Sequence, residues 1–120
     1  MSWTAEEMQT YRRTAMQRQQ TELQQVAQRR AHAWELARLA AAKLKAEFGV
    51  EQVMAFGSLT QADRFTQWSD IDLAVWGLND QNWLRASAAA QVGDVEVNLV
   101  DVATCKPEVL ATIECEGVVL

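Results

Sequence analysis

Cysteine, histidine and proline are scarce in this sequence. Its 120 residues include two cysteines, one histidine and one proline. Cys105 and Cys115 do not form a CxxC pair, so we expect two reduced thiols rather than a disulfide framework or a zinc site. The single histidine, His32, stands in a helical stretch with no cysteine or histidine near it, which favours an ordinary helix position over a metal ligand.

The chain also lacks an apolar run long enough to cross a membrane. Its first 13 residues contain two glutamates and no apolar core, so we expect no export or transit peptide and a cytoplasmic protein without a membrane partner. Hydrophobic residues make up 49% of the chain, which argues against disorder and suffices for one domain with a buried core.

Positive charge is missing from the second part of the chain. Residues 1–48 contain eight Lys or Arg and five Asp or Glu, whereas residues 49–120 contain three and eleven, so the two parts carry +3 and −8. Because phosphate backbones are bound by clustered cations, this acidic body argues against direct nucleic-acid binding.

Glycine and proline are absent from residues 4–48, which predicts a long helix. Thr4 and Glu7 form a capping-box pattern at its start, and Gly49 supplies its end. We expect one helix, or two if the polar stretch 17–25 interrupts it. Residues 29–48 have a broad apolar face that should pack on a domain spanning 29–120. Residues 1–28 form a helical extension, which either projects into solvent or docks on a partner or a second copy.

The pattern changes after Gly49. It predicts strands over 51–56, 70–77 and 95–102, a short helix or helical turn over 58–65, helices over 79–92 and 107–117, and a final apolar segment over 118–120. Alternating strands and helices indicate an α/β (α+β) fold, with a small mixed sheet of about three to four strands and helices packed on one face.

Two aspartates inside an apolar strand, in "SDIDLAV", need a reason, since aspartate disfavours strands. Residues i and i+2 of a strand point to the same face, so Asp70 and Asp72 project side by side. Such a pair is either a solvent-facing surface feature or a platform for a divalent cation, and hard oxygen ligands of this kind suit Mg²⁺.

Gly57 and Ser58 follow the preceding strand. A glycine lets a backbone approach a phosphate closely, and the N-terminus of a helical turn presents free N–H groups to an anion. A phosphate cradle and a metal platform on successive strands together describe a site for a metal–nucleoside triphosphate.

The combined pattern "FGS…SDIDLAV", with eleven residues between Ser58 and Asp70, resembles the signature of the DNA polymerase beta-like nucleotidyltransferase superfamily. The small size and the tail "EVNLVDV…IECEGVVL" are similar to those of its minimal nucleotidyltransferases, the MNT proteins. The resemblance covers about residues 29–120.

This resemblance implies that Gly57 and Ser58 hold the triphosphate and that Asp70 and Asp72 bind two Mg²⁺ ions. A third carboxylate on the third strand would complete the site. The implied reaction is transfer of a nucleoside monophosphate, AMP from ATP, to a hydroxyl group with release of pyrophosphate.

The chain departs from the family pattern at the third carboxylate. Relatives commonly read "VDLVDL" there, whereas this chain reads "VNLVDV", so Asn98 stands where the catalytic Asp is expected. Glu96 lies on the same face and is the candidate substitute, while Asp101 has the opposite parity. Arg64 is the only cation near the Gly57–Ser58 turn; it either reaches the phosphates or is an exposed surface residue.

The resemblance also implies a partner, because MNT proteins are commonly antitoxins paired with an RNA-cleaving HEPN-domain toxin, and some of them adenylylate it. Two functions remain open from the sequence: an active nucleotidyltransferase antitoxin, and a catalytically degenerate antitoxin that neutralises its partner by binding alone. The replacement at Asn98 favours the second.

Overall fold

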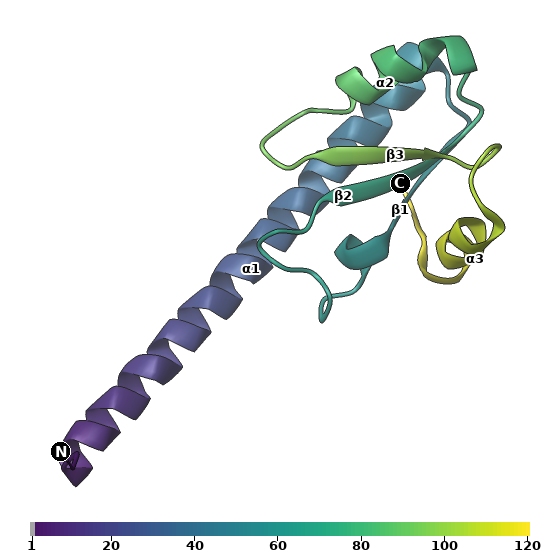
Figure 1. Cartoon of the computed structure of the whole chain (residues 1–120). Coiled ribbons are helices and arrows are strands. Elements are labelled where there is room, and N and C mark those ends of the chain that lie inside the picture. Colours follow the sequence, from purple (N-terminus) through teal and green to yellow (C-terminus); the bar gives the residue numbers. More distant parts are fainter. Residues whose placement is uncertain (1) are drawn as a thin grey trace.

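The computed structural model describes residues 2–120, which form a small domain with one very long helix (Figure 1). This helix, α1, spans Ala5–Phe48 without a break. The Thr4 side chain accepts a hydrogen bond from the Glu7 N–H at 3.1 Å, and Gly49 ends the helix in a left-handed conformation, as the sequence predicts. Glutamine is a good helix former, which explains why the polar stretch 17–25 does not interrupt α1.

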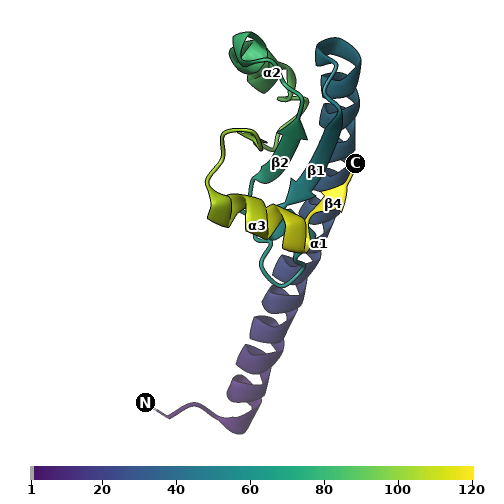
Figure 2. The same ribbon diagram turned by 90° about the vertical axis from the view of Figure 1, so that its right-hand side faces the viewer.

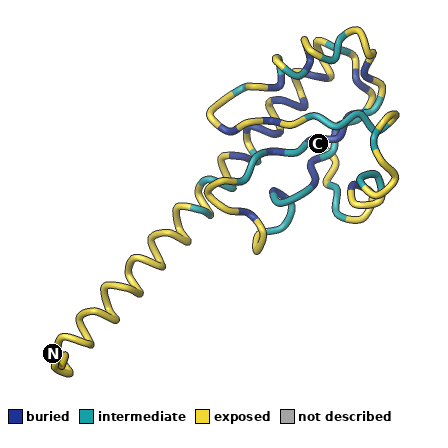
Figure 3. Tube along the Cα trace, in the orientation of Figure 1, coloured by how far each residue is buried: buried dark blue, intermediate teal, exposed yellow. Residues whose placement is uncertain are grey.

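The two halves of α1 have different surroundings. Residues 2–25 are exposed, and the first half-buried residue is Val26 (Figure 3). Further along, one face of the helix is buried against the domain, from Ala33 to Leu44. The predicted packing of residues 29–48 is confirmed. The N-terminal part of α1 extends away from the sheet, and the molecule measures 67 × 28 × 22 Å as a result.

Four strands form a mixed sheet in the order β3-β2-β1-β4. They are β1 (Gln52–Phe56), β2 (Ile71–Trp76), β3 (Val97–Asp101) and β4 (Val118–Val119). Strand β1 pairs antiparallel with β2 and β4, and β2 pairs parallel with β3. The predicted α+β fold with a mixed sheet is confirmed.

Both faces of the sheet are covered, at least in part. The main core joins α1 to side chains such as Val53, Leu73 and Val97, together with Ala86 of the short helix α2 (Trp83–Ala89). The opposite face carries Phe56 and Ala74, which pack against Ile113 of α3 (Pro107–Glu116). Figure 2 shows α1 and α3 on opposite sides of β1 and β2. The helix α3 is therefore an addition to the expected layer of helices on one face, and its Ile113 covers the apolar side chains that the opposite face presents.

The remaining predicted helices are shorter than expected. The segment after β1 forms one turn of 3₁₀ helix, Gly57–Thr60, which is the helical-turn alternative of the prediction. The segment predicted as helix 79–92 begins with a 3₁₀ turn, Asp80–Asn82, capped by the Asn79 side chain, and continues as α2. Cys105 and Cys115 are free thiols, as expected. None of the helices in residues 2–120 combines the length and hydropathy that a membrane span requires.

Candidate functional site

Asp72 stands at the centre of a row of side chains that crosses the sheet. Its register partners are Phe56 on β1 and Asn98 on β3. The Asn98 amide Nδ2 donates a hydrogen bond to Asp72 Oδ1 at 3.3 Å. Asp70 directly precedes β2, two residues from Asp72, and both side chains are half-buried. The structure thus brings the predicted aspartates beside the predicted third-strand position.

The environment of Asp72 disfavours its negative charge. Burial raises the pKa of the Asp72 carboxyl above its ordinary value of 3.8, the Asn98 hydrogen bond lowers it in part, and the charge of Asp70 raises it further. A divalent cation between the two carboxylates would remove both unfavourable effects, because it supplies the missing opposite charge. The residues present therefore fit Mg²⁺, which commonly binds through one or two carboxylates plus phosphate oxygens.

Position 57 favours glycine because of its backbone conformation and its close approach to Asp72. Its φ is +76°, a region that side chains other than glycine rarely adopt, and a Cβ on it would lie 2.7 Å from Asp72 Oδ2. The backbone of the predicted phosphate cradle thus lies directly against the predicted metal-binding carboxylate. Ser58 follows in the 3₁₀ turn and is half-buried.

The N–H of Gly57 has a partner that the sequence did not reveal. It donates to the Glu116 carboxylate Oε1 at 3.0 Å. Arg64 contacts the other oxygen of the same carboxylate, Oε2, at 3.4 Å. The Glu116 carboxylate thus connects Arg64 to the Gly57 backbone. The only signal for Glu116 was its place in the family-like tail "IECEGVVL", and no spacing rule connects that tail to Gly57.

Glu96 directly precedes β3, next to the point where Asp70 leads into β2. It is exposed in the segment before β3, and its backbone carbonyl accepts a hydrogen bond from the Ile71 N–H at 2.9 Å. Within residues 2–120, no three acidic, histidine or cysteine side chains lie close enough together to bind one metal ion. The role predicted for Glu96 as a third carboxylate stays a prediction.

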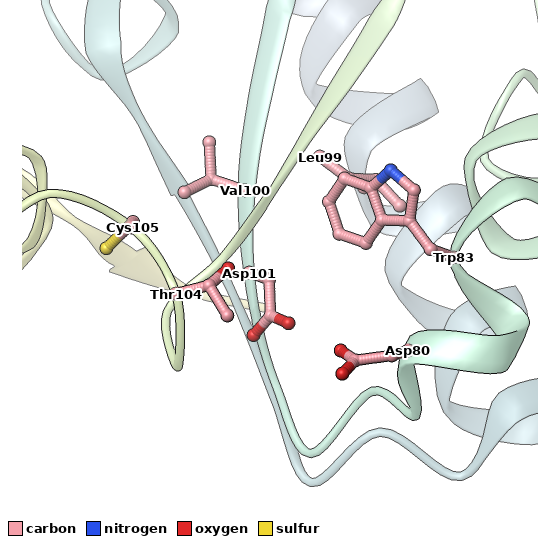
Figure 4. Close-up of a pocket in the computed structure, with 7 residues that line it drawn as sticks. All are labelled: Asp80, Trp83, Leu99, Val100, Asp101, Thr104 and Cys105. Atoms are coloured by element: carbon pink, nitrogen blue, oxygen red, sulfur yellow. The ribbon is translucent and has the colours of Figure 1, made fainter.

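Asp101 is the last residue of β3, and its parity, opposite to that of Asn98, places it on the other face of the sheet, as predicted. Its carboxylate caps the following turn by accepting from the Ala103 N–H at 3.0 Å. It lines a cavity of about 520 Å³ with Asp80, Trp83 and Leu99 among its neighbours. Figure 4 shows the carboxyl groups of Asp80 and Asp101 directed toward each other below the Trp83 ring. This cavity lies at the carboxyl end of β3, whereas Asn98 lies near its start, so the cavity is separate from the aspartate site.

Two arginines of α1 hold the loops that carry the site. The Arg29 guanidinium donates to the Ser69 carbonyl at 3.0 Å, next to Asp70. The Arg30 Nε donates to the Leu59 carbonyl at 2.9 Å, inside the turn that begins at Gly57. Sequence reasoning missed both anchors, since adjacent helix arginines normally indicate a solvated face. They fix the cradle and the aspartates to the same rigid helix.

The loop before Asp70 presents an exposed aromatic ring. Trp68 is 82% exposed. Its backbone N–H donates to Thr66 Oγ1 at 3.1 Å, and the Thr66 N–H donates to Ser69 Oγ at 2.9 Å. The loop is therefore ordered by its own hydrogen bonds, and the ring is exposed to solvent two residues before Asp70.

Comparison with known proteins assigns the family. Residues 40–120 match the family described as Polymerase beta, Nucleotidyltransferase. Because this match covers more than half of the chain, the protein belongs to the polymerase beta nucleotidyltransferase family. No curated protein sequence matches the chain.

Solved structures show the same fold. A chain in the crystal structure of a mutant of the toxin–antitoxin MntA–HpeT is 28% identical, with a TM-score of 0.53, over 66% of this chain and 66% of that one. This protein thus spans just under two thirds of the length of that chain. A chain from a toxin–antitoxin structure with AMP-PNP is 22% identical, with a TM-score of 0.55, over 67% of this chain and 68% of that one, and it supports the fold alone.

Proposed function

We propose that this protein transfers a nucleoside monophosphate, AMP from ATP, to a hydroxyl group on a partner protein. The observation that carries the proposal is the contact of Asp72 with Gly57: a half-buried carboxylate with a raised pKa lies against a glycine turn on the neighbouring strand. This juxtaposition supplies a metal ligand and a phosphate-binding backbone in one place. Membership of the nucleotidyltransferase family supports the same chemistry.

Each part of the site has a proposed task. Asp70 and Asp72 hold two Mg²⁺ ions, which would supply charge stabilisation of the attacking and leaving oxygens in an in-line displacement. Gly57 and Ser58 place the triphosphate against these carboxylates. Arg29 and Arg30 keep the two loops in a fixed relation, and such positioning provides much of the rate enhancement in this type of reaction.

The proposed reaction forms one bond at the α-phosphorus, breaks one, and releases one proton. The acceptor hydroxyl oxygen forms a bond to the α-phosphorus, the bond between that phosphorus and the bridging oxygen breaks, and pyrophosphate leaves. The hydroxyl proton has to go to a base. Asn98 cannot take it, because an amide carries no charge and is not a base. The proton therefore goes to solvent or to Glu96, and the reaction should be slow.

We also propose that the partner is a HEPN-domain toxin and that the protein acts as its antitoxin. The MNT resemblance and the similarity to a chain of the MntA–HpeT toxin–antitoxin structure support this. A neighbouring gene for a small helical protein with an RxxxxxH-type motif would identify the candidate. The N-terminal part of α1, whose residues 2–25 are exposed, is a surface on which such a partner can dock.

The second candidate function is neutralisation by binding alone. Asn98 favours it, since the site then lacks the third negative charge. The two functions separate in one experiment, in which the protein is incubated with ATP labelled at the α-phosphate, Mg²⁺ and the candidate toxin. Label on the toxin supports transfer. A stable complex that silences the toxin without label supports binding alone, and neither complex nor label contradicts both.

A further inference from the structure

Glu116 places a negative charge inside the phosphate cradle. Its carboxylate accepts the Gly57 N–H at 3.0 Å, and its side chain is only 14% exposed. Hydrogen bonds from backbone N–H groups to carboxylates are among the stronger ones in proteins. The group that a triphosphate would use at Gly57 is therefore already bound to an anion of the chain itself.

The backbone around Glu116 is firmly held. The Gly117 N–H donates to the Ile113 carbonyl at 2.8 Å, and a Cβ at Gly117 would clash with that carbonyl. Directly afterwards, β4 pairs with β1, and the Leu120 N–H donates to the Val53 carbonyl at 2.9 Å. Glu116 can therefore leave the Gly57 N–H only by rotating its side chain, not by moving α3.

Arg64 is coupled to the same carboxylate. Its guanidinium lies 3.4 Å from Glu116 Oε2, and its side chain is 58% exposed, so it remains free to turn toward another anion. A polyphosphate is a better partner than a single carboxylate for a guanidinium, because it offers more negative charge and several acceptor oxygens. A ligand that displaces Glu116 from Gly57 would also attract Arg64.

We propose that Glu116 is an internal competitor for the phosphate cradle. An incoming triphosphate takes over the Gly57 N–H, the Glu116 side chain rotates away, and Arg64 moves from Glu116 to the phosphates. This inference rests on the proposed function and adds to it a residue that sets nucleotide affinity. A competing role for Glu116 can be distinguished from a purely structural one. A structural hydrogen bond to the Gly57 N–H needs only an acceptor oxygen, whereas competition with a phosphate depends on the negative charge of Glu116.

The test is the substitution Glu116→Gln, since the glutamine amide oxygen still accepts the Gly57 N–H but carries no charge. The matched control is Glu114→Gln, which removes the same charge from an exposed residue of the same helix. Affinity for ATP with Mg²⁺ is measured by calorimetry on the full chain. We expect Glu116→Gln to bind roughly tenfold more tightly than wild type and Glu114→Gln to match wild type. Equal or weaker binding by Glu116→Gln overturns the inference.

A second variant leaves Glu116 unchanged and tests whether Arg64 moves from Glu116 to the phosphates. Arg64→Gln should weaken ATP binding several-fold, because the phosphates lose a cation, and unchanged binding contradicts this step. Asp70→Asn with Asp72→Asn separates the inference from the proposed function. If wild type binds ATP in a manner that depends on the aspartates while Glu116→Gln equals wild type, only the inference fails. If neither wild type nor Glu116→Gln binds ATP, both fail.

Discussion

Asp72 and Asn98 are direct partners across β2 and β3, and the amide of Asn98 donates to the carboxylate of Asp72 at 3.3 Å. An aspartate at position 98 would instead face a second carboxylate, and Asp70 would add a third negative charge nearby. The neutral amide thus makes the metal-free site easier to fold and leaves it poorer in charge for metal binding. This relationship underlies the first two predictions.

Asn98→Asp should raise nucleotidyl transfer. The new carboxylate would stand beside Asp72, where it adds a metal ligand and an acceptor for the hydroxyl proton. Single groups of this kind change rates by about 10²–10³-fold. The measurement is transfer of labelled AMP to the partner by wild type, Asn98→Asp and Glu96→Gln in parallel. If Glu96→Gln abolishes transfer while Asn98→Asp gains nothing, Glu96 is the third carboxylate instead.

Asp72→Asn should stabilise the metal-free protein at neutral pH. The raised pKa of Asp72 means that the folded state binds its proton more tightly than the unfolded state does. The charge of Asp72 therefore lowers the free energy of unfolding. This loss of stability is absent at a pH below the ordinary pKa of 3.8, grows as the pH rises toward the raised pKa of the folded state, and is constant above it. Asparagine keeps an acceptor for Asn98 and has no charge to lose.

The measurement is the melting temperature of both proteins with a chelator, from pH 4 to pH 8. About 1 kcal/mol shifts Tm by roughly 4–8 °C in a small domain, so a modest penalty is visible. The gain from Asp72→Asn should shrink on acidification. A lower Tm for the variant throughout the range would contradict the assignment of Asp72 as a destabilising, functional carboxylate.

Gly57→Ala should reduce both stability and nucleotide binding. The added Cβ would lie 2.7 Å from Asp72 Oδ2 in a backbone conformation that already disfavours alanine. Gly49→Ala is the matched control, because Gly49 has a φ of +65° with open space around its Cβ position. We expect a loss of about 1 kcal/mol for the control from the backbone alone and a larger loss for Gly57→Ala. Equal losses would show that the contact with Asp72 does not matter.

Gln91 should contribute stability through the edge of the sheet. Its side chain both accepts from the Val97 N–H at 3.0 Å and donates to the Val97 carbonyl at 2.7 Å, as a neighbouring strand would. Gln91→Ala removes both bonds, together with the one that the side chain donates to the Ser87 carbonyl at 3.0 Å, and should lower the free energy of unfolding by about 1–2 kcal/mol. Gln81→Ala, at an exposed position, is the control. Chemical denaturation measures both, and equal stabilities would contradict this role.

Local rules predicted part of the arrangement of the candidate site residues. Strand parity places Asp70, Asp72 and Asn98 on one face, and it correctly separates Asp101 from them. What the sequence could not predict depends on contacts between distant segments. The pairing of β4 with β1 brings Glu116 to Gly57, and the packing of α1 brings Arg29 and Arg30 to the site loops. The residue pattern within a single helix or strand does not predict these contacts, because they form only when the C-terminal tail and α1 pack against the sheet.

Thermal stabilisation by ATP with Mg²⁺ tests the assignment of Asp70 and Asp72 most directly. A ligand that binds only the native state raises the free energy of unfolding, by about 2.7 kcal/mol when the ligand concentration is 100 times Kd, and the Tm rises with it. We expect a clear increase for wild type at millimolar nucleotide, and none for the protein with both Asp70→Asn and Asp72→Asn, compared with each protein's own Tm without ligand. An absent shift in wild type and in Glu116→Gln, or an equal shift in the double variant, would contradict the assignment of Asp70 and Asp72 as the nucleotide and metal site.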